Sequence, residues 1–359
     1  MADRWRPQWT RLSGPRRLAG VDLARGLAVL GMLAAHLLVL PPFVWGDPGT
    51  WLELVDGRSS ILFAVLAGVS IALTTGGTHP VTAERLRAAR SRLAVRALAL
   101  WVLGILLIAT GVPVYVILPA YAILFLLAIP VVRFPAGPLL ALAGVGLVVM
   151  PWVQAGLEFL PLWDTLAGES LGLVIGWPYP FPLWVVFLLT GLGIGRLDLR
   201  SWRVAAALVV AGVGAAMVGY GIGALFAPAG EREPETYLEL VTSMQAHSGG
   251  LPEAVGSTGF VVAVLGLCLL LCRTPVATLV WPIRAAGSMP LTAYTAQIVV
   301  WAVWALVALG TTGDLAGFRA LAPFWPLTIG VVAGCSLWAL FLGRGPLESL
   351  LDRLTRRIR

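Results

Sequence analysis

Residues 20–36 read GVDLARGLAVLGMLAAH, an apolar run that nonetheless holds two charged residues and a histidine. With its flanks, to about 19–40, it is long enough to cross ~30 Å of hydrocarbon, since a helix needs about 20 residues at 1.5 Å each. Similar runs follow at about 58–76, 93–112, 114–132, 137–155, 181–196, 202–226, 255–272, 290–310 and 321–342. Continuous apolar runs without strand alternation form helices in lipid. The sequence therefore predicts an all-α polytopic integral membrane protein with about ten transmembrane helices in one bundle.

The composition agrees with this prediction. Hydrophobic residues make up 58% of the 359 residues, charged residues 12%, and the mean hydropathy is +0.88. Such a chain cannot cover a water-facing surface with polar groups, which excludes a soluble enzyme, a disordered region and a disulfide-stapled secreted domain. Cys268, Cys272 and Cys335 all lie in apolar runs, so we expect neither a disulfide framework nor a bound metal. The sequence also has no nucleotide-binding P-loop motif, which disfavours ATP-driven transport.

The basic residues predict the topology. All 25 are arginines, and most fall in segments on one side of the ten runs. Only Arg58, Arg232 and Arg319 fall on the other side, so the positive-inside rule places both termini in the cytoplasm of a multi-pass plasma-membrane protein. The predicted divisions are a basic N-terminus at 1–18, a transmembrane domain at 19–342 and a basic tail at 343–359. The external segments 41–57 and 227–254 are long enough to hold structure of their own.

The first predicted helix carries a polar stripe. Its members are spaced by three or four residues and so share one face: Asp22, Arg25, Val29, Met32 and His36. His36 lies about 16 Å beyond Arg25 along the axis. Arg25, paired with Asp22, could hold the phosphates of a donor, and His36 could serve as a general base or an acyl-accepting nucleophile. The alternative is a structural ion pair at a helix end and a histidine bonded to a neighbouring carbonyl.

Two further sites lie on the external side. Asp56 and Arg58 stand at the start of the second predicted helix, which returns past His36, so Asp56 and Arg58 could orient the His36 imidazole or the acceptor. Asp56 also suits a helix N-cap, and Arg58 an interfacial anchor. His247 lies in the second external segment and is a further catalytic candidate, although a lone loop histidine is more often incidental.

The ninth predicted helix contains polar residues in apolar surroundings. Tyr294 and Gln297 are neighbours on one face. They could line a substrate-binding cavity or form hydrogen bonds between helices. The sequence leaves both interpretations open.

Several stretches resemble a known family. The run at 20–36, DGRSSILFAVLAGVSIAL after it, and the C-terminal RAAGSMPLTAYTAQIVVW and GRGPLESLLDRLT resemble bacterial multi-span proteins related to heparan-alpha-glucosaminide N-acetyltransferase and the YeiB-like family. The spacing of Arg25 and His36 is also similar to an "RG…H" helix in membrane acyltransferases that modify surface polysaccharides. The resemblance implies an active histidine in the outer loop after the first helix. Here that loop, 41–57, has none, which leaves His36 and His247 as candidates.

The resemblance and the stripe together predict an acyl-CoA-dependent transmembrane acyltransferase. It would move an acyl group from cytoplasmic acyl-CoA to an amino or hydroxyl group of an extracytoplasmic glycan or cell-envelope precursor. Acetyl is the acyl group expected first. The assigned residues are His36, Asp56 and His247 for catalysis, Arg25 and Asp22 for acyl-CoA, and Arg58, Tyr294 and Gln297 for the acceptor, with no metal. The partners are the lipid bilayer, acyl-CoA and the acceptor, with no nucleic acid, and a homodimer is left open. The alternatives are a small-solute transporter or permease, in which the same stripe lines a permeation path, and a non-catalytic scaffold.

Overall fold

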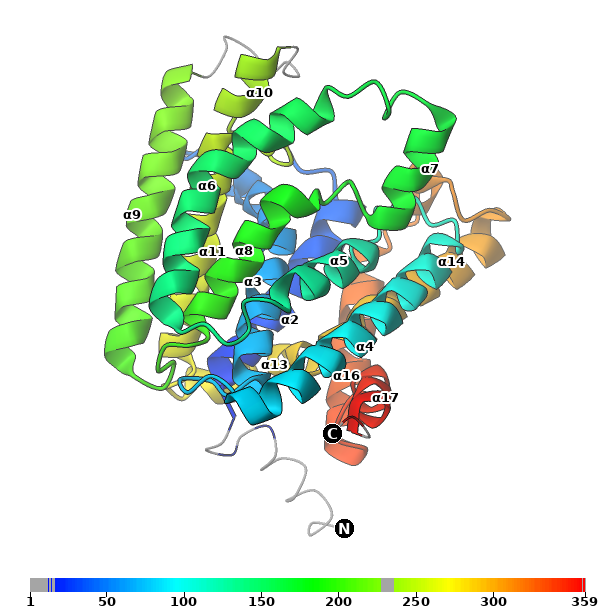
Figure 1. Cartoon of the computed structure of the whole chain (residues 1–359). Coiled ribbons are helices and arrows are strands. Elements are labelled where there is room, and N and C mark those ends of the chain that lie inside the picture. The colour runs from blue at the N-terminus through cyan, green and yellow to red at the C-terminus, as the bar shows by residue number, and fades with distance from the viewer. Residues whose placement is uncertain (1–11, 13, 15–16, 227–235, 357, 359) are drawn as a thin grey trace.

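The computed structural model describes residues 12, 14, 17–226, 236–356 and 358. These residues form helices and no strand, which confirms the all-α prediction (Figure 1). Most of the predicted N-terminal segment 1–18, and Arg232 of the second external segment, lie outside the described residues.

Each of the ten predicted spans coincides with a helix. Within the part of the chain that the structure describes, seven helices are by themselves long and apolar enough to cross a membrane: α2 (Ala19–Leu37), α4 (Ala83–Ile108), α6 (Ala136–Glu158), α9 (Trp202–Phe226), α11 (Leu251–Leu271), α14 (Pro290–Leu309) and α16 (Phe324–Phe341). The helix α3 (Arg58–Thr74) passes the same test together with the short helix η1 (Pro48–Val55), from which it is bent by 43°. The remaining two, α5 (Leu118–Ala128) and α8 (Phe181–Ile194), are apolar but shorter.

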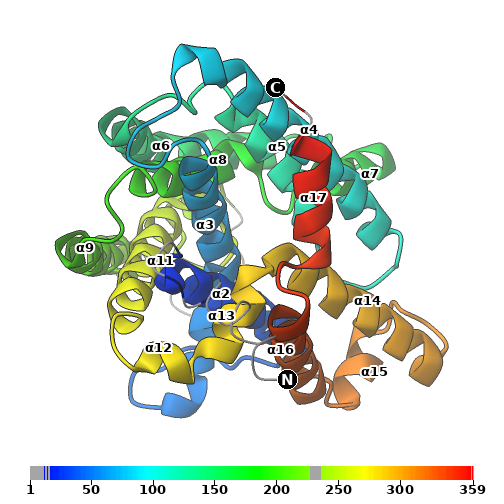
Figure 2. The same ribbon diagram turned by 90° about the horizontal axis from the view of Figure 1, so that it is seen from below.

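Short helices connect the spans at both ends. At one end, towards the top and right of Figure 1, lie η1, α7 (Leu166–Ile175), α10 (Tyr237–Thr242) and α15 (Leu315–Ala320). At the opposite end lie α12 (Val276–Leu279), α13 (Trp281–Ser288) and α17 (Pro346–Arg356). Viewed from that end, α17 runs between α4 and α14 and contacts both (Figure 2). We call the first end the cavity end, for the cavity described below, and the second the basic end.

Glycines set how closely the helices approach. A Cβ on Gly287 of α13 would lie 1.8 Å from the Asp22 carbonyl oxygen of α2, and one on Gly191 of α8 would lie 1.8 Å from the Val65 carbonyl oxygen of α3. In the pair α9 and α11, a Cβ on Gly219 would lie 2.3 Å from the Gly256 nitrogen. No larger residue fits at these points, so the helices cross at backbone contact, as small residues allow in membranes.

The bundle has a centre and an edge. In α2, 72% of the membrane-spanning window is buried inside the protein, but in α9 only 22% is. The polar stripe of α2 is therefore surrounded by protein, while most of α9 remains free to face lipid (Figures 1 and 2).

Candidate functional site

A cavity of about 2090 Å³ opens at the cavity end of the bundle. It is lined by the last turns of α2, the turn between η1 and α3, one face of α9, and the loop that precedes α11. Four residues singled out from the sequence lie on its wall: His36, Asp56, Arg58 and His247. The fold thus brings together side chains that are up to 211 positions apart in the sequence.

His247 and Asp56 form a pair in this cavity. The imidazole Nε2 lies 3.3 Å from Asp56 Oδ1, and about half of the His247 side chain is exposed. Because a carboxylate only accepts hydrogen bonds, Nε2 carries the proton and Nδ1 keeps its lone pair. Gly57 lets the two segments approach: its φ is +64°, and a Cβ there would lie 3.3 Å from the Ala246 Cβ.

A buried carboxylate fixes the backbone around His247. Glu253, only 5% exposed at the start of α11, accepts hydrogen bonds from the backbone nitrogens of His247 (2.8 Å) and Gly249 (2.6 Å) and from Ser248 Oγ (3.3 Å). His247 itself has φ of +67°, a left-handed conformation that costs energy in a residue with a Cβ. Glu253 holds the loop in this conformation and so presents the imidazole to Asp56.

The pair alters the pKa of both partners. Burial lowers the pKa of His247, but the hydrogen bond to Asp56 and the charges of Glu253 and Asp56 outweigh it, so the pKa is raised above its ordinary value. The hydrogen bond from His247 lowers the pKa of Asp56 despite the opposing effect of burial. Asp56 is therefore ionised at neutral pH, and the protonated form of His247 is favoured more than in a free histidine.

Arg58 is held in place beside this pair. Its Nε donates to the Tyr220 hydroxyl of α9 at 2.7 Å, and its guanidinium lies 5.1 Å from the centre of the same ring. An ion pair with Glu53 at 3.7 Å fixes the other side of the group. The cation is thus oriented by three contacts at the edge of the cavity, where an anionic or hydroxyl-rich group can meet it.

His36 reaches the cavity from the last turn of α2. Its carbonyl oxygen accepts two hydrogen bonds from Arg319 of α15, from Nε at 3.1 Å and from Nη2 at 2.8 Å. The carbonyls at the end of a helix lack intrahelical partners, and a guanidinium satisfies this one. The end of α2 is therefore anchored where the imidazole enters the cavity.

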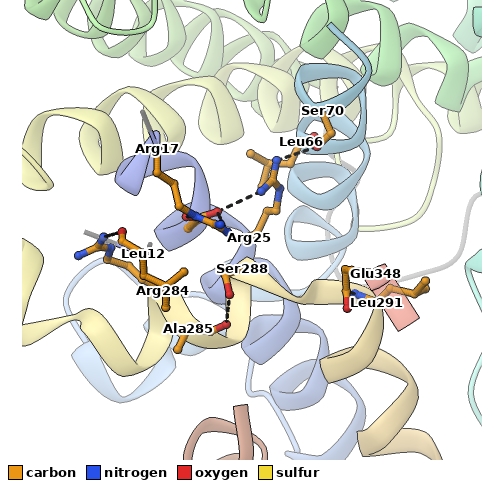
Figure 3. Close-up of polar contacts among 11 residues, drawn as sticks. Leu12, Arg17, Arg25, Leu66, Ser70, Arg284, Ala285, Ser288, Leu291 and Glu348 are labelled. Carbon is orange, nitrogen blue, oxygen red and sulfur yellow. Dashed lines mark hydrogen bonds and ion pairs between the residues drawn. The ribbon is translucent and has the colours of Figure 1, made fainter. Parts of the chain in front are cut away.

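Arg25 and Asp22 lie at the basic end and are not on the cavity wall. Arg25 Nη1 donates to Asp22 Oδ1 at 3.2 Å and Nη2 donates to Ser70 Oγ of α3 at 2.8 Å, while Arg17 also donates to Asp22 (Figure 3). Val29, one turn beyond Arg25 on the polar stripe, is completely buried, and the cavity reaches only as far as Met32 on α2. In this conformation packed side chains separate the arginine from the cavity.

Tyr294 and Gln297 lie inside the bundle, away from the cavity wall. Both are buried, and the Tyr294 hydroxyl accepts a hydrogen bond from the Ile117 backbone nitrogen at 3.2 Å. This geometry favours the interpretation of Tyr294 as a link between helices over that of an acceptor-binding residue. Aromatic side chains that do line the cavity are Tyr115, Trp177 and Tyr179.

Sequence reasoning missed Glu253 and Tyr220. Glu253 stands three residues after a glycine pair and just inside an apolar run, a position that an ordinary helix start also favours for a carboxylate. Tyr220 lies among glycines that read as packing residues. Only the spatial approach of α9 and α11 to the start of α3 reveals their partners.

Two family models match the chain. Residues 17–226 match heparan-alpha-glucosaminide N-acetyltransferase, catalytic, and residues 194–358 match a protein of unknown function (DUF418). A search of curated proteins found no match. The first model spans more than half of the chain and includes Arg25, His36, Asp56 and Arg58, which confirms the resemblance seen in the sequence. The chain therefore belongs to the heparan-alpha-glucosaminide N-acetyltransferase catalytic family, a family of transmembrane acetyltransferases.

Proposed function

We propose that this protein transfers an acetyl group from acetyl-CoA to an amino or hydroxyl group of a glycan acceptor bound in the cavity. The observation that carries the proposal is the Asp56–His247 pair, which stands with His36 and Arg58 on one cavity wall. A carboxylate that orients an imidazole is the arrangement used for general-base catalysis of acyl transfer.

The reaction needs one base and one proton donor. His247 Nδ1 takes the proton from the acceptor nitrogen or oxygen as that atom attacks the thioester carbonyl. A C–N or C–O bond forms, the C–S bond breaks, and the sulfur of CoA leaves with the proton returned through an imidazole. Asp56 stabilises the imidazolium that forms between these steps. His36 faces the same space and is the second imidazole able to deliver the proton to the sulfur.

The two substrates enter from opposite ends in this proposal. The arginine content of the basic end supports its placement in the cytoplasm, with both termini there and the cavity outside the plasma membrane. The phosphates of acetyl-CoA would contact Arg25 and Arg17. Because Val29 is buried between this site and the cavity, α2 and its neighbours must separate before the thioester reaches His36.

Aromatic rings give the cavity an affinity for sugars. Tyr115, Trp177 and Tyr179 line the cavity, and the ring of Tyr115, which is exposed, is the one against which the C–H groups of a pyranose can rest. Tyr179 is fixed by donating to the Tyr115 carbonyl oxygen at 3.0 Å. Arg58 and Glu53 supply polar groups beside them. A cavity with apolar walls and a few oriented polar groups is typical of a small-molecule site.

The test uses the full-length protein in lipid nanodiscs, with acetyl-CoA and methyl α-D-glucosaminide. His247→Asn removes the base while keeping a residue that tolerates a positive φ, so the loop retains its conformation. We expect kcat to fall by about 10²-fold or more, as loss of a general base does. His36→Asn should also lower kcat. His79→Asn is the matched control and should leave kcat unchanged. His79 lies at the basic end, away from the cavity, with its Nδ1 2.9 Å from the hydroxyl oxygen of Thr78.

Retention of full acetyl transfer by both His247→Asn and His36→Asn would contradict the assignment of the site. Absence of transfer in the unaltered protein, together with glucosaminide flux into liposomes without acetyl-CoA, would instead support a permease.

A further inference from the structure

The cavity is not confined to the cavity end of the bundle. Along α9 its wall extends from Phe226 to Val213, about 20 Å at 1.5 Å per residue. Along α11 it extends to Ala263, which lies about 18 Å from the helix start at Leu251. Half of a ~30 Å hydrocarbon core is about 15 Å, so this part of the wall lies at the depth of the lipid chains.

The deep part of the wall has a different chemistry from the upper part. It consists of apolar side chains of α9 and α11: Val213, Ala216, Met217, Phe260 and Ala263. The ionisable residues of the wall all lie nearer the cavity end. Glycines bring the two helices to backbone contact here, since a Cβ on Gly212 would lie 2.5 Å from the Ala263 nitrogen. We call the channel along this seam the α9–α11 groove.

The α9–α11 groove is open to the side. Met217 is 72% exposed and Val213 45%, although both also line the cavity. The helix α9 lies at the edge of the molecule in both views (Figures 1 and 2), so the exposed side of these residues faces the bilayer. A hydrocarbon chain can therefore enter the groove sideways from the membrane.

Arg58 stands where the groove meets the polar site. Its guanidinium lies 5.1 Å from the ring centre of Tyr220 and 6.0 Å from that of Phe260, and Phe260 belongs to the groove. Asp56 precedes it by two residues. A molecule with its chain in the groove would thus place its head group beside Asp56 and His247.

We propose that the acceptor is a membrane-embedded amphiphile, whose sugar head occupies the cavity and whose hydrocarbon chain lies in the α9–α11 groove. This inference rests on the proposed acetyl transfer and names the class of its acceptor. Continuity of the groove with the Asp56–His247 pair distinguishes it from the rest of the lipid-facing surface, where ordinary membrane lipid would bind without reaching any polar site. Because such a chain is already surrounded by hydrocarbon, the groove adds little hydrophobic transfer energy and acts by packing against the chain and holding the head group beside the Asp56–His247 pair.

A binding experiment tests the groove without relying on catalysis. Dodecyl α-D-glucosaminide with a diazirine near the chain end is photo-cross-linked to the full-length protein in nanodiscs, and the attachment sites are mapped by mass spectrometry. We expect cross-links at Met217, Val213 and Phe260 that excess unlabelled dodecyl glucosaminide suppresses and methyl glucosaminide does not. Cross-links spread evenly over all lipid-facing helices, with no suppression, would overturn the inference.

Kinetics supply the second test. We expect KM for dodecyl glucosaminide to be at least 10-fold lower than for methyl glucosaminide. Met217→Trp fills the groove and should raise KM for the dodecyl acceptor several-fold while leaving the methyl acceptor unchanged. Val218→Trp is the matched control, because Val218 is exposed on α9 at the same depth but is not on the cavity wall.

The outcomes separate the two proposals. Equal KM values for both acceptors, or equal effects of Met217→Trp on both, would overturn the amphiphile while leaving acetyl transfer intact. Suppressible cross-linking in the groove without any acetyl transfer would retain the groove and reject the reaction.

Discussion

The carboxylate of Glu253 fixes the loop that carries His247, although it is not itself one of the reacting groups. Replacing it by glutamine leaves one oxygen acceptor but turns an amide N–H₂ towards the backbone of the 247–249 loop. We expect Glu253→Gln to lower the free energy of unfolding by about 1–3 kcal/mol, the cost of an unpaired buried polar group. We also expect kcat to fall by roughly 10-fold, with KM for acetyl-CoA unchanged. Thermal unfolding and steady-state kinetics measure the two effects.

Glu169 supplies the control for that experiment. It is an exposed carboxylate on α7 at the same end of the molecule, so Glu169→Gln should leave both stability and kcat unchanged. A wild-type kcat and unfolding temperature in Glu253→Gln would show that the loop does not depend on this carboxylate.

The Asp56–His247 pair also predicts a pH dependence. A general base must be neutral, so kcat should fall as the pH decreases through the pKa of His247, which the pair raises above its ordinary value. Asp56→Asn removes the negative charge and lowers that pKa, so the acid limb of the profile should move to lower pH. At pH 8, kcat should nevertheless fall by about 10²-fold, because the imidazolium loses its counter-charge.

The measurement is a kcat profile between pH 5 and pH 9. Asp164→Asn, which alters an exposed carboxylate at the same end, should retain the wild-type profile. An acid limb that stays in place in Asp56→Asn would mean that another group controls the rate.

At the scale of residues, the sequence singled out ionisable candidates but did not give the contacts between them. The imidazoles and Asp56 were found because ionisable groups are few in an apolar chain. The sequence assigned Asp56 to His36, but the hydrogen bond of Asp56 is to His247, which follows it by 191 residues and approaches it only through the fold. Arg25 and His36 do share a helix face. The helical periodicity does not predict that Val29 is buried between them, because its burial depends on the neighbouring helices.

The helix crossings offer a test at the scale of elements. Gly287→Ala would place a methyl group 1.8 Å from the Asp22 carbonyl oxygen, so α13 and α2 must separate. We expect a loss of about 1–3 kcal/mol of stability, as overpacking causes. Gly144→Ala in α6 is the matched control. A Cβ at Gly144 meets nothing within 4 Å, and alanine is the better helix former, so stability should hold or rise.

The fluorescence of a thiol-reactive dye can follow this unfolding without the introduction of any new cysteine. Cys268, Cys272 and Cys335 are free and at least half shielded, so they react as the bundle opens. Equal unfolding temperatures for Gly287→Ala and Gly144→Ala would show that the α2–α13 crossing is not tight.

The long helices could be predicted because the length of an apolar run is enough to identify a membrane span. All ten predicted spans coincide with helices, including α6 and α8, whose runs are interrupted by proline and glycine. The sequence indicated some structure in the external segments that contain η1 and α10 but did not predict these helices or α7, because short helices between spans depend on the surfaces they cover. The helices η1 and α10 line the cavity, so its shape was the part that could not be derived.

At the scale of the whole molecule, the arginine distribution predicts that the cavity faces away from the cytoplasm. A membrane-impermeant maleimide should label Gly46→Cys, at the cavity end, in intact cells. It should label Thr78→Cys, at the basic end, only after permeabilisation. Both positions are exposed, and the unaltered chain measures the background from its three cysteines. The opposite pattern would reverse the direction of transfer.

The contact between Asp56 and His247 has a consequence for how the chain can be divided. Asp56 lies within the region matched by the acetyltransferase model, and His247 lies beyond its end at residue 226, in the region matched only by the other model. A polypeptide ending at residue 226 would keep the carboxylate and lack the imidazole it orients. Two fragments separated between residues 226 and 236 should be inert alone. Co-expressed, they should regain activity to the extent that α9 and α11 reassociate along their glycines.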